Sequence, residues 1–228
     1  MPRSGVRSDS RRRPWVLFYG GNVKISAILS DIGEVVAPFD NQRTFRALAE
    51  FSGLPVERVQ EIIMVKGLPL LDQYERGEVS TDQFQKIVCS RLNLAKREMP
   101  TPQAFFKAYA DVFTLRYDVL ARWCHLRARG IALVAVSNIC EMRYERLAAM
   151  GTFDVFDHEI MSFKEGHRKP SVELMVRALD RAGCKAEEAL FVDDLEPNLG
   201  PAKELGMQTH HFTTAPELFA FLETAGVK

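Results

Sequence analysis

The chain has 228 residues, of which 30 are basic and 30 acidic, so its formal net charge is zero. This length suffices for one large domain, or for a core with a smaller insert. The balanced charge argues against a nucleic-acid partner. No apolar run reaches the roughly 20 residues that cross a bilayer, so we expect no membrane partner either.

The cysteines and the first residues bear on the setting in which the chain works. The four cysteines are widely spaced and form no Cys-x-x-Cys pair, which favours reduced thiols in a cytoplasmic protein: Cys89, Cys124, Cys140 and Cys184. Residues 1–22 are rich in arginine and serine. We interpret them as a basic, disordered extension, with a targeting peptide as the alternative.

A long helical segment interrupts the chain after its first strand. Residues 24–30 predict a strand that runs into Asp31, and the next strand pattern is at 131–136. Between them, helical patterns begin near Thr44, Pro55, Ser80 and Pro102. Ser80 and Gln83 have the spacing of a capping box. We therefore predict a helical insert over 39–111, within a core made of 23–38 and 112–228.

The second half of the chain alternates between helices and strands. Helices are predicted at 117–129, 142–150, 171–182, 201–205 and 216–225, and strands at 131–136, 155–160, 189–192 and 208–212. Repeated strand–helix units are typical of a parallel sheet with helices on both faces. The predicted fold is therefore α/β, a doubly wound, Rossmann-like parallel sheet.

Polar residues follow three of the predicted strands, and they should meet at one edge of the sheet. Asp31 ends the first strand, where it either caps a turn or acts as a nucleophile. Asp193 and Asp194 end another. Adjacent acids repel each other unless a cation offsets them, which suits Mg²⁺. Because side chains alternate along a strand, we expect Asp194 to reach the metal and Asp193 to orient a water or backbone amides, with Asn198 near them.

Two further segments supply groups for a phosphate. Ser137 and Asn138 follow the second strand, and their hydroxyl, amide and backbone N–H groups suit phosphate oxygens, although a polar turn explains them equally well. Lys169 precedes Pro170, and an ammonium there neutralises a nucleophile and phosphate oxygens. The Lys169 interpretation depends on the other segments, since most lysines are merely solvated.

Four segments, taken in chain order, resemble the four motifs of the haloacid dehalogenase superfamily: Asp31-Ile32-Gly33, Ser137, Lys169 and Asp193-Asp194. The resemblance is to the subfamily with a helical cap after the first strand. Segments 74–80 and 191–198 are similar to the branch that holds the phosphatase domain of soluble epoxide hydrolase and small sugar-phosphate phosphatases. The resemblance covers about residues 24–225. It implies a phosphatase with Asp31 as nucleophile, Mg²⁺ on Asp31, the Gly33 carbonyl and Asp194, and phosphate held by Ser137 and Lys169.

One position departs from the family pattern. Phosphatases of the family usually carry an acid–base aspartate two residues after the nucleophile, where this chain has Gly33. Glu34 is interpreted as a turn residue facing solvent, with a substitute acid–base role as the alternative.

The expected substrate is a small phosphorylated metabolite, and the expected oligomeric state is a monomer or homodimer. The alternatives are a metal-independent dehalogenase and a weakly active or non-catalytic protein that binds a phosphate ligand.

Overall fold

Five short strands form one parallel sheet in the computed structural model, which describes residues 24–63, 70–94 and 100–228. Their order across the sheet is β3-β2-β1-β4-β5. The strands are β1 (Ala27–Ser30), β2 (Ala132–Ser137), β3 (His158–Met161), β4 (Ala189–Asp193) and β5 (Gln208–His211). Because the chain starts in the middle of the sheet and winds outward in both directions, the predicted doubly wound α/β fold is confirmed.

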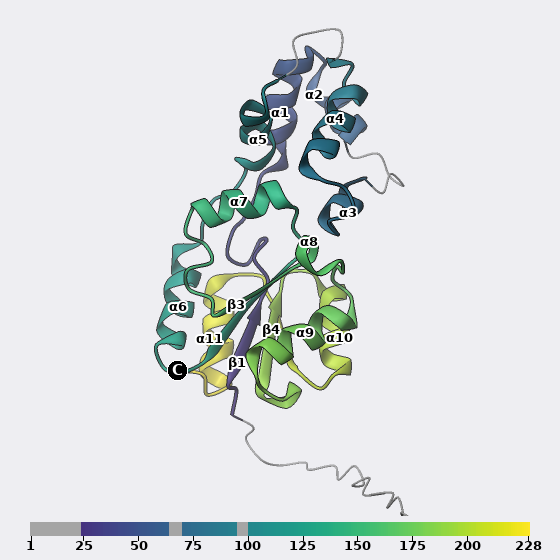
Figure 1. Ribbon diagram of the computed structural model, residues 1–228. Coiled ribbons are helices and arrows are strands. Elements are labelled where there is room, and N and C mark those ends of the chain that lie inside the picture. Colours follow the sequence, from purple (N-terminus) through teal and green to yellow (C-terminus); the bar gives the residue numbers. More distant parts are fainter. Residues whose placement is uncertain (1–23, 64–69, 95–99) are drawn as a thin grey trace, which may run out of the picture.

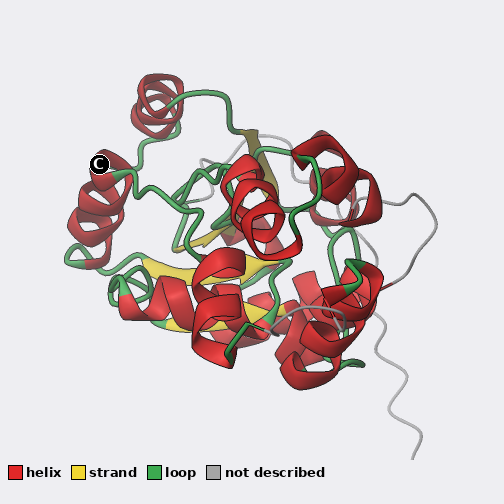
Figure 2. Ribbon diagram, turned by 90° about the horizontal axis from the view of Figure 1, so that it is seen from above, coloured by secondary structure: helices red, strands yellow, loops and turns green. Residues whose placement is uncertain are grey.

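Helices cover both faces of the sheet (Figures 1 and 2). Ile28, Leu133 and Leu190 point to the face packed against α6 (Tyr117–Arg127) and α11 (Ala215–Thr224). Their neighbours Leu29, Val134 and Phe191 point to the face packed against α9 (Val172–Ala182) and α10 (Glu196–Glu204). Every one of these six side chains is fully buried, which explains why the inner strands β1, β2 and β4 carry runs of apolar residues instead of alternating.

Six helices lie between β1 and β2 in the described ranges, and the first five form what we call the helical unit: α1 (Asn41–Ser52), α2 (Val56–Ile63), α3 (Leu70–Glu75), α4 (Thr81–Arg91) and α5 (Pro102–Ala110). They share a hydrophobic core that includes Leu48, Tyr74, Phe84 and Phe105. Figure 1 shows the unit above the carboxyl ends of the strands. Two remaining helices, α7 (Glu141–Ala149) and α8 (Ser162–Glu165), lie beneath it.

The two segments that join the helical unit to the sheet run side by side. The Asp40 N–H donates to the Val112 carbonyl at 3.0 Å, and Phe39 and Phe113 form an antiparallel bridge. Local capping explains where α4 begins. The predicted capping box of α4 is present, with the Ser80 hydroxyl and the Gln83 side chain each accepting from the other's backbone N–H.

Several predicted boundaries differ from the structure. β3 begins at His158 instead of 155, because the apolar residues before it form turns. α10 begins at Glu196 instead of 201, with Pro197 in its first turn and Pro201 inside the helix. α3 and α8 were not expected, since each is too short to show a helical period. Two predictions lie outside the described residues: the basic extension over 1–22, and residues 64–65 at the end of the helix predicted from Pro55.

No helix within the described ranges has both the length and the apolar character to cross a membrane.

Candidate active site

The carboxyl ends of β1 and β4 bring the first and last motifs together. Ser30 is paired in register with Ala135 of β2 and Val192 of β4, and the Asp31 N–H donates to the Val192 carbonyl at 2.8 Å. The residue after each strand therefore emerges at the same edge. This is the edge that faces the helical unit (Figure 1).

Lys169 lies between two of the predicted aspartates. Its Nζ atom is 2.8 Å from Asp31 Oδ1 and 2.7 Å from Asp193 Oδ2. All three residues are buried, with exposed fractions of 6% for Asp31, 5% for Lys169 and 0% for Asp193. A buried charge is stable only when it is paired, and one ammonium here serves two carboxylates.

The Asn138 side chain holds the Lys169 backbone. Asn138 Nδ2 donates to the Lys169 carbonyl at 3.0 Å, and Asn138 Oδ1 accepts from the Lys169 N–H at 2.7 Å. This pair of hydrogen bonds links the loop after β2 to the segment before α9. The Lys169 backbone thus occupies the Asn138 side-chain oxygen and one of the two N–H groups of its amide. The phosphate contact expected from Asn138 stays a prediction.

Asp193 is fixed by further hydrogen bonds. Its Oδ1 atom accepts from the Leu195 N–H at 2.9 Å and from Asn198 Nδ2 at 2.8 Å. Asn198 is near because α10 begins five residues earlier than expected and places it in the first turn. Asp193 therefore binds Lys169, a backbone amide and Asn198 at once.

Burial sets the protonation of Asp31. Its desolvation raises the pKa of the Asp31 carboxyl to about 7; Lys169 opposes this rise, and the charge of Asp193 adds to it. The same two carboxylates raise the pKa of Lys169, against the effect of its burial. Lys169 is therefore a permanent cation in the neutral range, and Asp31 is the group whose charge responds to its surroundings.

Three carboxylates gather closely enough to hold a cation. One oxygen each of Asp31, Asp193 and Asp194 lies within 4.8 Å of the others. Burial and the neighbouring Asp193 raise the pKa of Asp194, and the Asp194 carboxylate forms no ion pair within the described ranges. Hard oxygen donors of this kind suit Mg²⁺. The residues present therefore fit a magnesium ion.

The residues after Asp31 form a tight turn. The Gly33 carbonyl accepts the Val35 N–H at 2.5 Å. Glu34 has a left-handed backbone (φ 53°), and its carboxylate accepts the Phe39 N–H at 3.3 Å. The expected turn at Glu34 is present. The Glu34 side chain is half-buried and contacts the backbone, instead of facing solvent only.

Ser137 and Ser162 differ in what their hydroxyls do. Ser137 is buried at the end of β2, and its hydroxyl makes no hydrogen bond within the described residues. Ser162, which sequence reasoning did not single out, accepts the Ile139 N–H at 2.9 Å and donates to the Ile139 carbonyl at 3.1 Å. Ser162 thus shapes the loop that carries Asn138, a role without any local sequence signal.

Charged groups also join the helical unit to the site, and these too were not expected. Arg168 Nη1 lies 2.7 Å from Asp72 Oδ1, and Arg168 Nη2 lies 2.8 Å from Glu75 Oε2. Glu75 is 8% exposed, and its burial raises its pKa while Arg168 opposes the rise. Both acids belong to α3, whereas Arg168 directly precedes Lys169.

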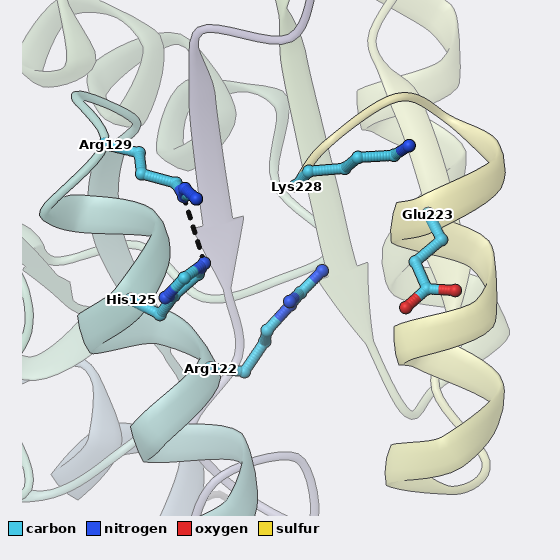
Figure 3. Close-up of a pocket in the computed structure, with 5 residues that line it drawn as sticks. All are labelled: Arg122, His125, Arg129, Glu223 and Lys228. Atoms are coloured by element: carbon cyan, nitrogen blue, oxygen red, sulfur yellow. Dashed lines mark hydrogen bonds between the residues drawn. The ribbon is translucent and has the colours of Figure 1, made fainter.

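A cavity of about 470 Å³ lies at the other end of the sheet (Figure 3). Figure 3 shows Arg122, His125 and Arg129 on the α6 side and Glu223 and Lys228 on the α11 side. It is lined by none of the predicted site residues. The predicted chemistry therefore belongs to the edge beneath the helical unit.

Comparison with known proteins places this fold and site in a family. Residues 25–206 match the model of the haloacid dehalogenase-like hydrolases, and the chain therefore belongs to this family. It is an enzyme of the hydrolase class, as the order of the motifs indicates.

Relatives and solved structures extend the comparison. The chain is 32% identical to a glyceraldehyde 3-phosphate phosphatase of Methanopyrus kandleri, over 81% of this chain and 82% of that protein. It is 28% identical to the sesquiterpene phosphatase astK of Aspergillus oryzae, over 62% and 71%. A crystal structure of the HAD family enzyme bt-2542 of Bacteroides thetaiotaomicron, in complex with magnesium and inorganic phosphate, superposes with a TM-score of 0.72 at 20% identity, covering 86% and 99%.

Proposed function

We propose that the chain is a Mg²⁺-dependent phosphomonoesterase that hydrolyses a small phosphorylated metabolite through an aspartyl-phosphate at Asp31. The observation that carries the proposal is the placement of Lys169 within 2.8 Å of Asp31 and 2.7 Å of Asp193, at the strand edge that also holds Asp194. A cation next to a buried carboxylate suits attack on an anionic phosphate. The phosphatase names of the relatives support the same reaction.

Three groups would hold the metal: the carboxylates of Asp31 and Asp194 and the Gly33 carbonyl. The three-carboxylate cluster and the absence of an Asp194 ion pair within the described ranges support this choice. When bound, Mg²⁺ supplies positive charge that offsets the phosphate and the crowded acids. Asp193, whose oxygens already bind Lys169, Leu195 and Asn198, would orient the site instead.

In the proposed reaction, each step is assigned to one of the chain's own groups. Asp31 attacks phosphorus, a new oxygen–phosphorus bond forms, and the bond to the leaving oxygen breaks. Water then attacks the phosphorus of the acyl phosphate and regenerates the Asp31 carboxylate. Lys169 and Ser137 hold the phosphoryl oxygens, and Asn138 positions Lys169 through its backbone. Gly33 offers no carboxyl group, so the leaving oxygen takes its proton from water.

The helical unit would act as a cap over the site, formed by residues 39–111. Its position above the strand ends and the low exposure of Asp31 support a role in excluding bulk water from the acyl phosphate. The names of these relatives indicate substrates whose leaving groups are as different as a sesquiterpene and a triose. A substrate screen should therefore include apolar and polyhydroxylated phosphates.

The test is phosphate release from a generic aryl phosphate and from that screen, with Mg²⁺ and with EDTA. We expect turnover by the wild-type chain that requires Mg²⁺ and is abolished by Asp31→Asn. Unchanged turnover in Asp31→Asn, or chloride release from haloacids that persists in EDTA, would contradict the proposal.

A further inference from the structure

Arg168 connects the helical unit to the catalytic lysine. Its two terminal nitrogens bind two carboxylates of α3, at 2.7 Å for Asp72 and 2.8 Å for Glu75. The next residue, Lys169, binds the two carboxylates of the sheet edge. Two consecutive residues thus join the two parts of the molecule at the site itself.

The contacts of Arg168 with Asp72 and Glu75 are ion pairs, and an arginine side chain suits them. A planar guanidinium presents several donors in a fixed fork and reaches two acids at once, whereas a lysine ammonium is a point charge. The Arg168 side chain is 27% exposed and that of Glu75 is 11% exposed, so the pair is partly shielded from water. Removing one partner leaves the other charge poorly compensated.

A displacement of the Arg168 backbone would also displace Lys169, because the two residues are adjacent in the chain. The Lys169 backbone is held on its far side by the two hydrogen bonds of Asn138, so this segment is fixed between the end of β2 and α3. Asp31 and Lys169 are nearly inaccessible in this closed arrangement, at 6% and 5% exposure. Because Asp72 and Glu75 both belong to α3, the Arg168 pairs must break or shift whenever α3 moves away from the sheet.

We propose that Arg168 is a positioning residue, which rests on the proposed phosphatase function: its paired contacts with Asp72 and Glu75 couple closure of the helical unit to placement of the Lys169 ammonium. When α3 is docked, Arg168 holds residue 169 in register with Asp31. When α3 moves away, the loop loses the Arg168 contacts and keeps only those of Asn138, Asp31 and Asp193, and the phosphate site loosens.

The chain offers a matched control for this role. Arg146 of α7 binds Asp111, in the segment that returns from the helical unit, with hydrogen bonds of 3.0 and 2.7 Å. Its side chain is 36% exposed, similar to that of Arg168. Arg146 thus joins the same two parts of the molecule without contacting the segment that carries Lys169. If the substitutions acted only by weakening the contact between the helical unit and the rest of the molecule, substitutions of Arg146 and Arg168 would have similar effects.

The experiment compares Arg168→Gln with Arg146→Gln in the full chain with Mg²⁺. We expect Arg168→Gln to lower kcat/KM and to weaken competitive inhibition by inorganic phosphate, each by about 10- to 100-fold, because small displacements of a positioned group have large effects. Arg146→Gln should change both by less than about threefold, since it lies outside the site. Equal effects of the two variants on phosphate inhibition would overturn the proposal.

Two further measurements separate positioning from folding. Arg168→Gln added to the Asp72→Asn, Glu75→Gln double variant should have little additional effect on kcat/KM, because the three residues act as one unit. Arg168→Lys, which keeps the charge but not the fork, should recover only part of the loss; full recovery would contradict the geometry. If Arg168→Gln does not fold, the Asp72→Asn, Glu75→Gln variant replaces it in the comparison.

Hydrogen exchange distinguishes this proposal from the proposed function. Peptides covering α3 should exchange faster in Arg168→Gln than in the wild type, without any turnover being needed. Unchanged exchange would refute the coupling while leaving phosphatase activity intact. A wild-type chain without Mg²⁺-dependent phosphatase activity would refute the function, whatever the exchange rates show.

Discussion

Asp31 combines two opposing effects at the scale of a single residue. Burial disfavours its charge, and Lys169, 2.8 Å away, favours it. The balance leaves the Asp31 carboxyl with a pKa of about 7, against an ordinary value of 3.8. In the proposed mechanism, a second cation at this edge would favour the charged form of Asp31 and so activate it as a nucleophile.

The raised pKa predicts how the metal-free chain responds to pH. Between about 3.8 and 7 the folded chain keeps a proton on Asp31 that the unfolded chain has lost, so this contribution to stability is present at low pH and is lost as pH rises through 7. In EDTA, the free energy of unfolding of the wild type should therefore fall relative to that of Asp31→Asn over this range. Urea unfolding of both proteins checks this, and a difference independent of pH would contradict the assigned pKa.

Gly33 allows a gain-of-function test at the position where the family usually has an acid. A Cβ atom there would meet only the Phe39 ring, at an ordinary 3.5 Å, so the backbone at this position accepts a Cβ atom. Gly33→Asp should raise kcat for alkyl phosphates by up to about 100-fold, because general acid catalysis contributes about 10²–10⁴-fold. Nitrophenyl phosphate, whose leaving group needs no proton, should gain less.

Gly33→Asn is the matched control for that variant, since it has the same shape without a titratable proton. An equal gain in both variants would assign the effect to packing. No gain in a folded Gly33→Asp would mean that another group already serves as the acid.

At the scale of helices and strands, the sequence predicted those features that are determined by residues close together in the chain. The capping box of Ser80 and Gln83 is confirmed, and so are the parallel strand–helix units. α10 was misjudged because Pro201 looks like a helix start. Inside the helix, its missing N–H leaves one backbone bond unmade, and burial of Leu199 and Ala202 offsets that loss.

The turn between α3 and α4 packs closely against α8. Gly77 has φ of 70°, and a Cβ atom there would lie 2.3 Å from the Phe163 carbonyl oxygen of α8. Gly77→Ala should destabilise the chain by about 1–3 kcal/mol and raise KM, because a strained backbone and a clash act together. Chemical denaturation and steady-state kinetics measure the two effects.

Gly183→Ala provides the reference, since Gly183 has a similar φ of 65° and no atom within 4 Å of the added Cβ. It should lose stability from backbone strain alone and leave KM unchanged. If both variants behave alike, the clash with Phe163 has no part in docking the helical unit.

At the scale of the whole molecule, the sequence predicted the fold class and the residues that meet at the strand ends. The reason is that strands in a parallel sheet all deliver their last residues to one edge. The contacts of Arg168 with Asp72 and Glu75 were not predictable, because they join segments about a hundred residues apart, and ordinary surface charges carry no pattern that marks them. The same holds for Ser162, whose partner loop is set only by the packed fold.

The most direct test is to stop the enzyme with acid during turnover of a phosphate ester and to locate the phosphoryl group by mass spectrometry of the digested chain. The mechanism predicts a phosphorylated peptide containing Asp31, formed with Mg²⁺, and no adduct in EDTA or in Asp31→Asn. A chain that releases phosphate while its Asp31 peptide stays unmodified, or that carries the adduct on another residue, would contradict it.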